Sequence, residues 1–185
     1  MTPARHDLPI LVAGGGIGGV AAALALGRKG HAVHVLEQSD GLGEVGAGIQ
    51  IAPNAFRMFK ALGVTEAIND VAVLPDHLVM MDALDGSEVT RVPLNDGLFR
   101  EHFEFPYAVI YRPDLHRVLI EACEALPNVR LQTGVDVTGQ EDLGTHVQVA
   151  TGSGETIDGA ALIAADGLWS RVRKEIVDDG RPRVS

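Results

Sequence analysis

The 185-residue sequence contains one cysteine, Cys123, and no long run of basic residues. A single cysteine excludes an internal disulfide and a cysteine-cluster metal site, and such sparse use suits a reducing cytoplasm. Its setting in "RVLIEACEAL" predicts a small buried side chain on a helix. The formal net charge is −10, and the 15 Lys and Arg residues are scattered. We therefore expect no nucleic-acid partner.

Signals for a metal or for hydrolytic chemistry are also missing. The seven histidines show no metal-ligand spacing, so we expect no metal site. His116 in "DLH" is expected on a helix surface or in packing. No local motif indicates a Ser-His-Asp arrangement, and no catalytic side chain is assigned. Internal repeats and low-complexity segments are absent, and the 46% hydrophobic and 22% charged composition is typical of a soluble globular protein.

Charge is absent from residues 8–27, a stretch that is long enough to cross a membrane. Many of its positions are glycine, and Pro9 lies near its start. Because a glycine-rich turn between a strand and a helix explains this composition better, we expect no membrane span.

The same region reads as a βαβ unit. Residues 8–14 form an apolar strand, residues 18–30 an Ala- and Leu-rich helix, and residues 32–38 an alternating β-branched strand. A right-handed crossover between such strands requires a parallel sheet. The sequence therefore predicts an α/β, Rossmann-like domain with a parallel-centred sheet.

A second kind of structure is predicted by residues 77–92. Two strand-like runs flank the turn signal Leu-Asp-Gly-Ser, which indicates a hairpin. Further strands are expected at 107–111 and within 129–165, and helices at 54–64, 113–126 and 169–177. We expect residues 1–71 and 107–185 to form one discontinuous domain with a small antiparallel sheet, and residues 72–106 to belong to part of a second domain.

The motif "GGGIGG" carries the clearest chemical signal. Gly14, Gly16 and Gly19 occupy the G-x-G-x-x-G positions, with Gly18 between them, directly after the first strand and at the start of the helix. These glycines allow a tight turn, close approach of a pyrophosphate and close helix–strand packing. Glu37 closes the second strand about twenty residues later, where a carboxylate accepts both ribose hydroxyls and repels a 2′-phosphate. The motif predicts a site for FAD or NAD rather than NADP.

Three further segments decide between these cofactors by resemblance. Together with the glycine motif, "SDGLGEVGAGIQIAPNAFRMFKALGV" (39–64), "YRPDLH" (111–116) and "LIAADGLWSRVR" (162–173) resemble the flavin-dependent aromatic hydroxylases. These are single-component FAD monooxygenases, and the sequence is most similar to the 3-hydroxybenzoate 6-hydroxylase and salicylate hydroxylase branch. The resemblance covers nearly the whole chain in the right order and implies FAD as the cofactor.

The resemblance also implies roles for single residues. Gln38 joins Glu37 in the cofactor site, and Arg112 corresponds to an arginine that reaches FAD, although an ordinary surface arginine is the alternative. The backbone of Val137 corresponds to an adenine contact, which is compatible with core packing of its side chain. Asp166 corresponds to the Asp-Gly motif beside the FAD and nicotinamide pyrophosphates; the alternative is that it caps the following helix.

The loop "GEVGAGIQI" corresponds to the segment that passes the flavin ring, where Gly46 and Gly48 let the backbone approach. Gln50 stands where some relatives place a histidine that faces the substrate. A glutamine can orient a phenol by hydrogen bonding but cannot act as a general base.

The implied function is hydroxylation of a small aromatic acid of the hydroxybenzoate or salicylate type, with NADH or NADPH as co-substrate and O2 as the oxygen source. Two alternatives stay open: an FAD-dependent reductase or dehydrogenase, and a non-catalytic FAD-binding fragment. The sequence ends before the family's later Gly-Asp motif, so we expect an incomplete and inactive portion of the enzyme. A homodimer is compatible with the sequence.

Overall fold

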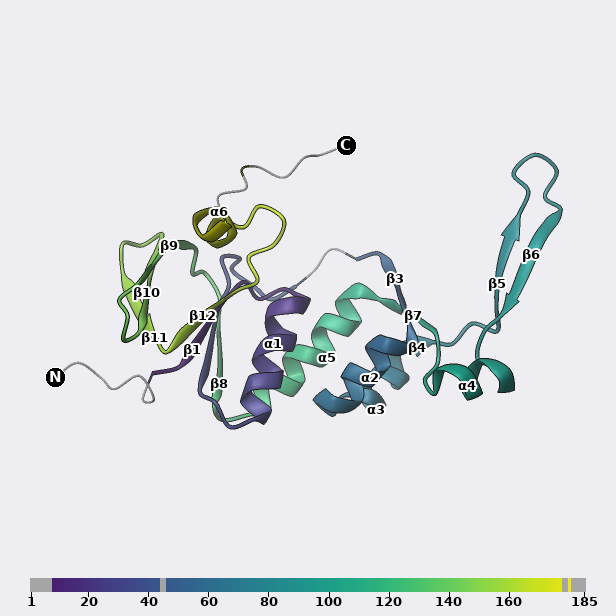
Figure 1. The fold of residues 1–185 in the computed structure, drawn as a ribbon, viewed down its shortest axis with the longest axis horizontal. Coiled ribbons are helices and arrows are strands. Elements are labelled where there is room, and N and C mark those ends of the chain that lie inside the picture. The colour runs from purple at the N-terminus through teal and green to yellow at the C-terminus, as the bar shows by residue number, and fades with distance from the viewer. Residues whose placement is uncertain (1–7, 44–45, 178–179, 181–185) are drawn as a thin grey trace. The chain divides into compact units, whose positions relative to one another are not determined.

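The computed structural model describes residues 8–43, 46–177 and 180. Contacts between residues divide the chain into two units. The first unit contains Met1–Glu44 and Leu119–Ser185, and the second contains Val45–Val118. Each unit has its own sheets and helices, labelled in Figure 1, and is described by itself.

A parallel sheet of four strands forms the centre of the first unit. In spatial order these strands are β12 (Ala161–Ala164), β1 (Ile10–Ala13), β2 (Val33–Leu36) and β8 (Val129–Gln132). All three neighbouring pairs are parallel. The predicted βαβ unit and its parallel sheet are therefore confirmed, and the α/β fold class with them.

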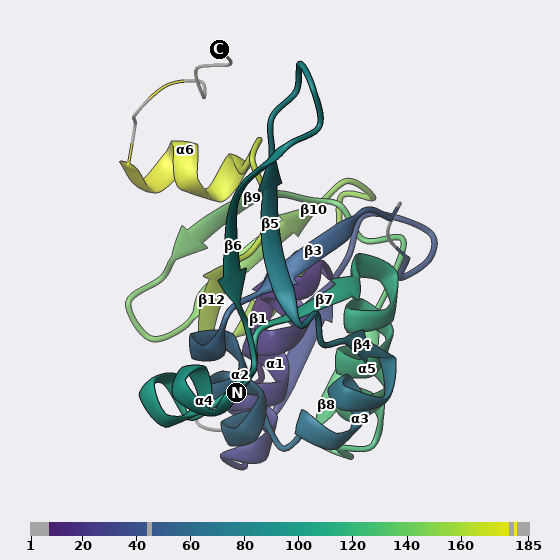
Figure 2. The same cartoon turned by 90° about the vertical axis from the view of Figure 1, so that its right-hand side faces the viewer.

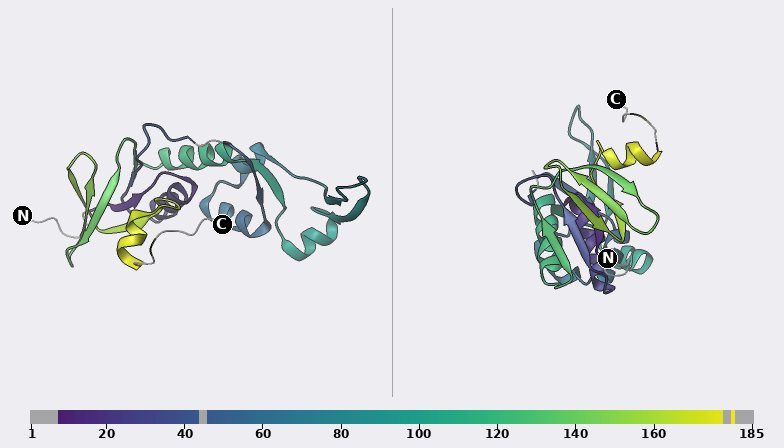
Figure 3. Two further views of the ribbon diagram at one scale, coloured as in Figure 1. Left: turned by 90° about the horizontal axis from the view of Figure 1, so that it is seen from above. Right: turned by 90° about the vertical axis from the view of Figure 1, so that its left-hand side faces the viewer.

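The two faces of this sheet are covered differently. Helix α1 (Ile17–Arg28) packs on one face, and the antiparallel sheet β11-β10-β9 lies on the other, as Figure 3 shows. The strands of the second sheet are β9 (Val137–Asp142), β10 (Val147–Thr151) and β11 (Thr156–Gly159). Leu11 and Leu36 on the parallel sheet form a buried cluster with Val149 on β10. Covering on both faces explains why β1 and β2 are almost uniformly apolar.

Two helices complete the first unit. Helix α5 (Arg112–Glu124) contributes its second half, and α6 (Arg171–Val177) follows β12. Cys123 on α5 is fully buried, and its thiol donates to the carbonyl of Val20 at 3.3 Å. Burial raises the pKa of this thiol to about 11. The expected small buried cysteine on a helix is confirmed.

The second unit contains a three-stranded antiparallel sheet and several short helices. The sheet order is β3 (Gly48–Ile51), β7 (Ala108–Tyr111) and β4 (Ala72–Val73). The helices are α2 (Pro53–Leu62), α3 (Thr65–Val71), α4 (Gly97–Phe103) and the first half of α5. Helix α2 ends at Gly63, which has the left-handed conformation, one residue before the end of the helix predicted at 54–64. His116 on α5 is buried, so its expected packing role is confirmed.

The predicted hairpin is present as β5 (His77–Met81) and β6 (Glu88–Pro93), paired antiparallel. It forms a separate two-stranded sheet within the second unit, and Figure 2 shows it standing clear of α3 and α4. Strands β3 and β4 and helices α3 and α4 were not predicted, because each is a short element. Among the described residues, no helix is long and apolar enough to cross a membrane.

Candidate functional site

The glycine motif forms the turn between β1 and α1. Gly14 has a φ of +103°, and a Cβ built there would lie 2.3 Å from the carbonyl oxygen of Ala165. A Cβ on Gly19 would lie 1.9 Å from the carbonyl oxygen of Gly14. Both positions therefore require glycine, one for the turn and one for the close approach of helix and strand. Gly16 caps α1 without any side-chain hydrogen bond, which leaves the first turn of the helix available to an anion.

Glu37 follows β2 and faces the same turn. Its Oε2 accepts the backbone N–H of Gly15 at 2.6 Å, and its Oε1 accepts that of Ser39 at 2.9 Å. Partial burial by itself raises the pKa of this carboxyl, but the donors on Ser39 and Gly15 outweigh it, so the pKa lies below its ordinary value. The side chain is therefore an oriented carboxylate. Each oxygen keeps acceptor capacity beyond its backbone donor.

A cavity of about 430 Å³ opens beside this turn, within the size range of small-molecule sites. It lies at the carboxyl ends of β1 and β2, where ligands of open α/β sheets bind. Fifteen residues line it: Ala13, Gly14, Gly16, Leu36, Glu37, Gln38, Val135, Asp136, Val137, Ala165, Asp166, Gly167, Leu168, Trp169 and Arg171. Six residues selected from the sequence thus come together, namely Gly14, Gly16, Glu37, Gln38, Val137 and Asp166.

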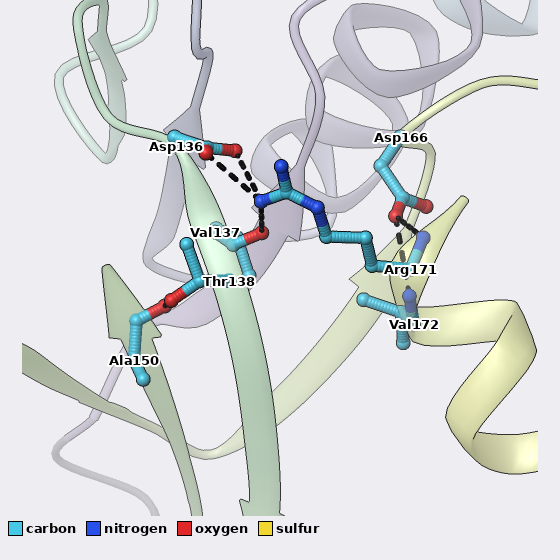
Figure 4. Close-up of polar contacts among 7 residues, drawn as sticks. All are labelled: Asp136, Val137, Thr138, Ala150, Asp166, Arg171 and Val172. Atoms are coloured by element: carbon cyan, nitrogen blue, oxygen red, sulfur yellow. Dashed lines mark hydrogen bonds and ion pairs between the residues drawn. The ribbon is translucent and has the colours of Figure 1, made fainter. Parts of the chain in front are cut away.

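Asp166 both lines the cavity and caps α6. Its Oδ2 accepts the backbone N–H groups of Arg171 at 2.8 Å and Val172 at 3.3 Å, and its Oδ1 accepts the Ser170 hydroxyl at 2.6 Å. The capping interpretation of Asp166 is confirmed by its bonds to the backbone N–H groups of Arg171 and Val172, which Figure 4 shows. Its role toward a cofactor stays a prediction.

The two arginines of "SRVR" differ in placement. Arg171 lines the cavity, but its guanidinium pairs with Asp136 at 2.8 Å. The backbone N–H of Arg173 donates to the Ser170 hydroxyl at 2.9 Å, and Arg173 is not among the residues that line the cavity. The positive charge of Arg171 at this wall of the cavity is therefore already paired with the carboxylate of Asp136.

The other selected residues lie outside the cavity lining. Gly18 and Gly19 are in the first turn of α1, and Gly18 is exposed with open space around its Cα. Gly48 and Gln50 lie on β3, and Arg112 begins α5; all three belong to the second unit and are exposed. Gly18 and Gly19 were selected from the glycine motif, and Gly48, Gln50 and Arg112 by resemblance; the roles of all five remain predictions.

Several lining residues were missed by the sequence analysis. Asp136 and Trp169 are the most polar and the largest of these, and they come from the approach to β9 and from the loop after β12. Nothing in their local pattern distinguishes them from ordinary surface residues. Within the described ranges, no group of three or more His, Cys, Asp or Glu residues is placed to hold a metal ion.

Comparison with known families matches residues 7–180 to the FAD binding domain family. The chain belongs to this family, and FAD is the cofactor that this membership assigns. Curated relatives of the chain include 3-hydroxybenzoate 6-hydroxylases, so the predicted resemblance to the flavin-dependent aromatic hydroxylases is confirmed.

Two curated relatives and one solved structure are similar to most of the chain. The chain is 47% identical over 176 residues to 3-hydroxybenzoate 6-hydroxylase 1 of Aquipseudomonas alcaligenes, covering 95% of the chain and 44% of that protein. It is 49% identical over 173 residues to 3-hydroxybenzoate 6-hydroxylase of Polaromonas naphthalenivorans, covering 94% and 43%. The structure of tetrameric 2-methyl-3-hydroxypyridine-5-carboxylic acid oxygenase superposes with a TM-score of 0.79 and 26% identity, covering 92% and 42%. The chain thus spans less than half the length of these relatives.

Proposed function

We propose that the cavity of the first unit holds the adenosine and pyrophosphate of FAD, and that the protein is an FAD-dependent hydroxylase of a small aromatic acid. The observation that carries this proposal is the oriented Glu37 carboxylate beside the glycine turn. The hydroxylation is proposed for a protein of the relatives' full length. Residues 1–71 and 107–185 would form its FAD-binding domain, and 72–106 would contribute to a substrate domain.

The residues that form the cavity fit the pyrophosphate and adenosine of FAD. A side chain at Gly14 or Gly19 would collide with backbone, and the tight turn that these glycines allow leaves the uncapped start of α1 open to a pyrophosphate. Glu37 would accept the ribose hydroxyls with the lone pairs that Gly15 and Ser39 leave. The walls at Val137 and Asp166 would flank the adenosine. When bound, FAD supplies electron transfer from NADH or NADPH and the activation of O2.

The chain's own residues would act by binding and orientation. Water exclusion around a reacting flavin would depend on cover over the ring. For Gly48 and Arg112 we propose contact with the cofactor, and for Gln50 contact with the substrate. The substrate class proposed is a hydroxybenzoate or salicylate, supported by the likeness to 3-hydroxybenzoate 6-hydroxylases. We place the protein in the cytoplasm, in keeping with its single buried thiol.

Titration with FAD tests the site. Hydrogen bonds to a charged group are worth roughly 1.5–3 kcal/mol, so Glu37→Ala should weaken FAD binding about 10- to 100-fold. FMN lacks the adenosine, so its weaker binding should not change in the same variant. Glu141→Ala, at an exposed position on β9 outside the cavity lining, is the matched control. An unchanged FAD affinity in Glu37→Ala would remove Glu37 from the site.

Product analysis tests the reaction. A protein of the relatives' length, incubated with NADH or NADPH, O2 and a panel of hydroxybenzoates, should form a hydroxylated product with matching O2 consumption. Nicotinamide oxidation that needs no O2 would favour a reductase or dehydrogenase instead. Stoichiometric FAD without any nicotinamide oxidation would favour a non-catalytic binding protein.

A further inference from the structure

Arg171 joins two walls of the cavity through different parts of the same residue. Its Nη1 donates to Oδ1 and Oδ2 of Asp136 at 2.9 and 2.8 Å and reaches the carbonyl oxygen of Val137 at 3.4 Å. Its backbone N–H donates to Asp166 on the opposite wall at 2.8 Å. Figure 4 shows the Arg171 side chain extending from the start of α6 toward Asp136 and Val137 at β9, with Asp166 on the loop that precedes α6.

Apart from Arg171, the two walls of the cavity are anchored by hydrogen bonds to different strands or loops. Asp136 is fixed at the entrance to β9, where its carbonyl accepts the N–H of Gly152 at 2.8 Å. The opposite wall is the loop 165–170, rooted on β1 by the bond from the N–H of Ala165 to the carbonyl of Ala13 at 2.8 Å. Leu168 and Trp169 at the tip of this loop are both 63% exposed, so packing contributes little to its placement. The far end of the loop leads into α6, where Val172 is 2% exposed, and the ion pair of Arg171 adds a polar contact with Asp136 at this end.

We propose that Arg171 is a positioning residue: its ion pair with Asp136 latches the loop 165–170 to β9 and so fixes the cavity wall that carries Asp166. In this interpretation the guanidinium of Arg171 forms an ion pair with Asp136 and does not bind a ligand phosphate. That the ligand is FAD rests on the function proposed above; the latch itself is a property of the ligand-free protein.

The expected effect on binding is small, because both side chains are partly exposed, at 52% and 39%. Exposed ion pairs contribute little in water, so opening the latch should weaken FAD binding by about two- to five-fold. Arg171→Gln and Asp136→Asn should each have this effect. The double variant should lose no more than either single variant, since both remove the same interaction.

Two readouts test the latch on the purified chain. The first is the FAD dissociation constant of the wild type, Arg171→Gln, Asp136→Asn, the double variant and the charge exchange Asp136→Arg with Arg171→Asp. The second is the steady-state anisotropy of tryptophan emission without ligand, which reports on this loop because Trp169 is the only tryptophan of the sequence. Arg91→Gln, which breaks an exposed ion pair with Glu88 on the hairpin, is the control.

A latch predicts lower Trp169 anisotropy in both single variants, recovery in the charge exchange, and no change in Arg91→Gln. If anisotropy and FAD affinity are the same in all variants, the latch is wrong. If Arg171→Gln alone weakens FAD binding while Asp136→Asn does not, Arg171 contacts the ligand directly and the positioning role is overturned. If the anisotropy pattern holds but the wild type binds no FAD, the latch stands and the proposed FAD site fails.

Discussion

The two units of the chain differ in how their strands are covered. In the first unit, β1 and β2 lie between α1 and the β9–β11 sheet, and nearly all of their side chains are buried. In the second unit, the strands of the β5–β6 hairpin remain exposed, including Leu78, Met80 and Val92. A sheet buried on both faces fixes its loops, and the cavity lies at the ends of those strands. The hairpin has no cover from the part of the chain that the structure describes.

Truncation of a core side chain should give the largest contrast. Leu36 on β2 is 1% exposed, whereas Leu84 at the tip of the hairpin is 97% exposed. Leu36→Ala should lower the free energy of unfolding by about 2–5 kcal/mol, because it removes buried contacts and leaves a cavity. Leu84→Ala should change it by less than about 0.5 kcal/mol. Urea denaturation of both variants measures the difference; comparable losses would show that the hairpin tip is not free of packing.

Two neighbouring glycines sharpen the contrast within the first unit. Gly19→Ala should destabilise by about 1–3 kcal/mol, because its Cβ meets the backbone at Gly14 and the helix must move away from the strand. Gly18→Ala meets nothing within 4 Å and should stabilise the protein by about 0.5–1 kcal/mol through helix propensity. Thermal melts of the two variants should shift in opposite directions. Shifts of the same sign would contradict the close approach at Gly19.

The second unit has its own polar tie at Asn95. Its side-chain amide donates to the carbonyls of Pro75 at 3.0 Å and Tyr107 at 2.9 Å, and it accepts the N–H of Tyr107 at 2.8 Å. Asn95 also has a φ of 64°. Asn95→Ala should cost about 1–2 kcal/mol from the lost hydrogen bonds, and Asn95→Gly should cost less because glycine adopts this conformation freely. Equal denaturation midpoints for wild type and Asn95→Ala would show that these bonds contribute nothing.

A smaller effect should appear in the pH dependence of stability. The folded state lowers the pKa of Glu37, so its contribution is fully present above the unfolded pKa, near 4.5, and is lost as pH falls through the lower folded value. Glu37→Gln should therefore be slightly less stable than wild type at neutral pH, and the two should converge below pH 4.5. Denaturation curves across this range measure it. Glu66→Gln, a surface change in the second unit, serves as control, and a gap that persists at low pH would exclude the carboxylate as its cause.

The smallest effect is expected on the hairpin. Arg91 pairs with Glu88 on the exposed β6 strand, with side chains 48% and 41% exposed, where screening removes most of the interaction. Arg91→Gln should leave the melting temperature unchanged at moderate salt. A clear drop would show that this ion pair lies in a less hydrated setting than the rest of the hairpin.

Local patterns predicted the regular parts of both units. The βαβ unit, the hairpin and helix α2 each depend on neighbouring residues, and the structure has all three. The short elements β3, β4, α3 and α4 were missed, since each is set by contacts rather than by its own periodicity. The glycines, Glu37 and Asp166 belong to sequence motifs and could be selected from them. Asp136 and Trp169 reach the cavity only through tertiary contacts and could not.

The sequence by itself predicted the type of site. The glycine turn and the carboxylate after the second strand are local features whose chemistry follows from residue type and spacing, whereas the Asp-Gly pair was selected through the family resemblance. Only the tertiary structure decided which of the selected residues share one cavity, that both oxygens of Glu37 already accept backbone donors, and that Arg171 is paired with Asp136. The physical reason is that such pairs join residues far apart in the chain. Their distances are set by how the sheets and α6 pack, which no local pattern specifies.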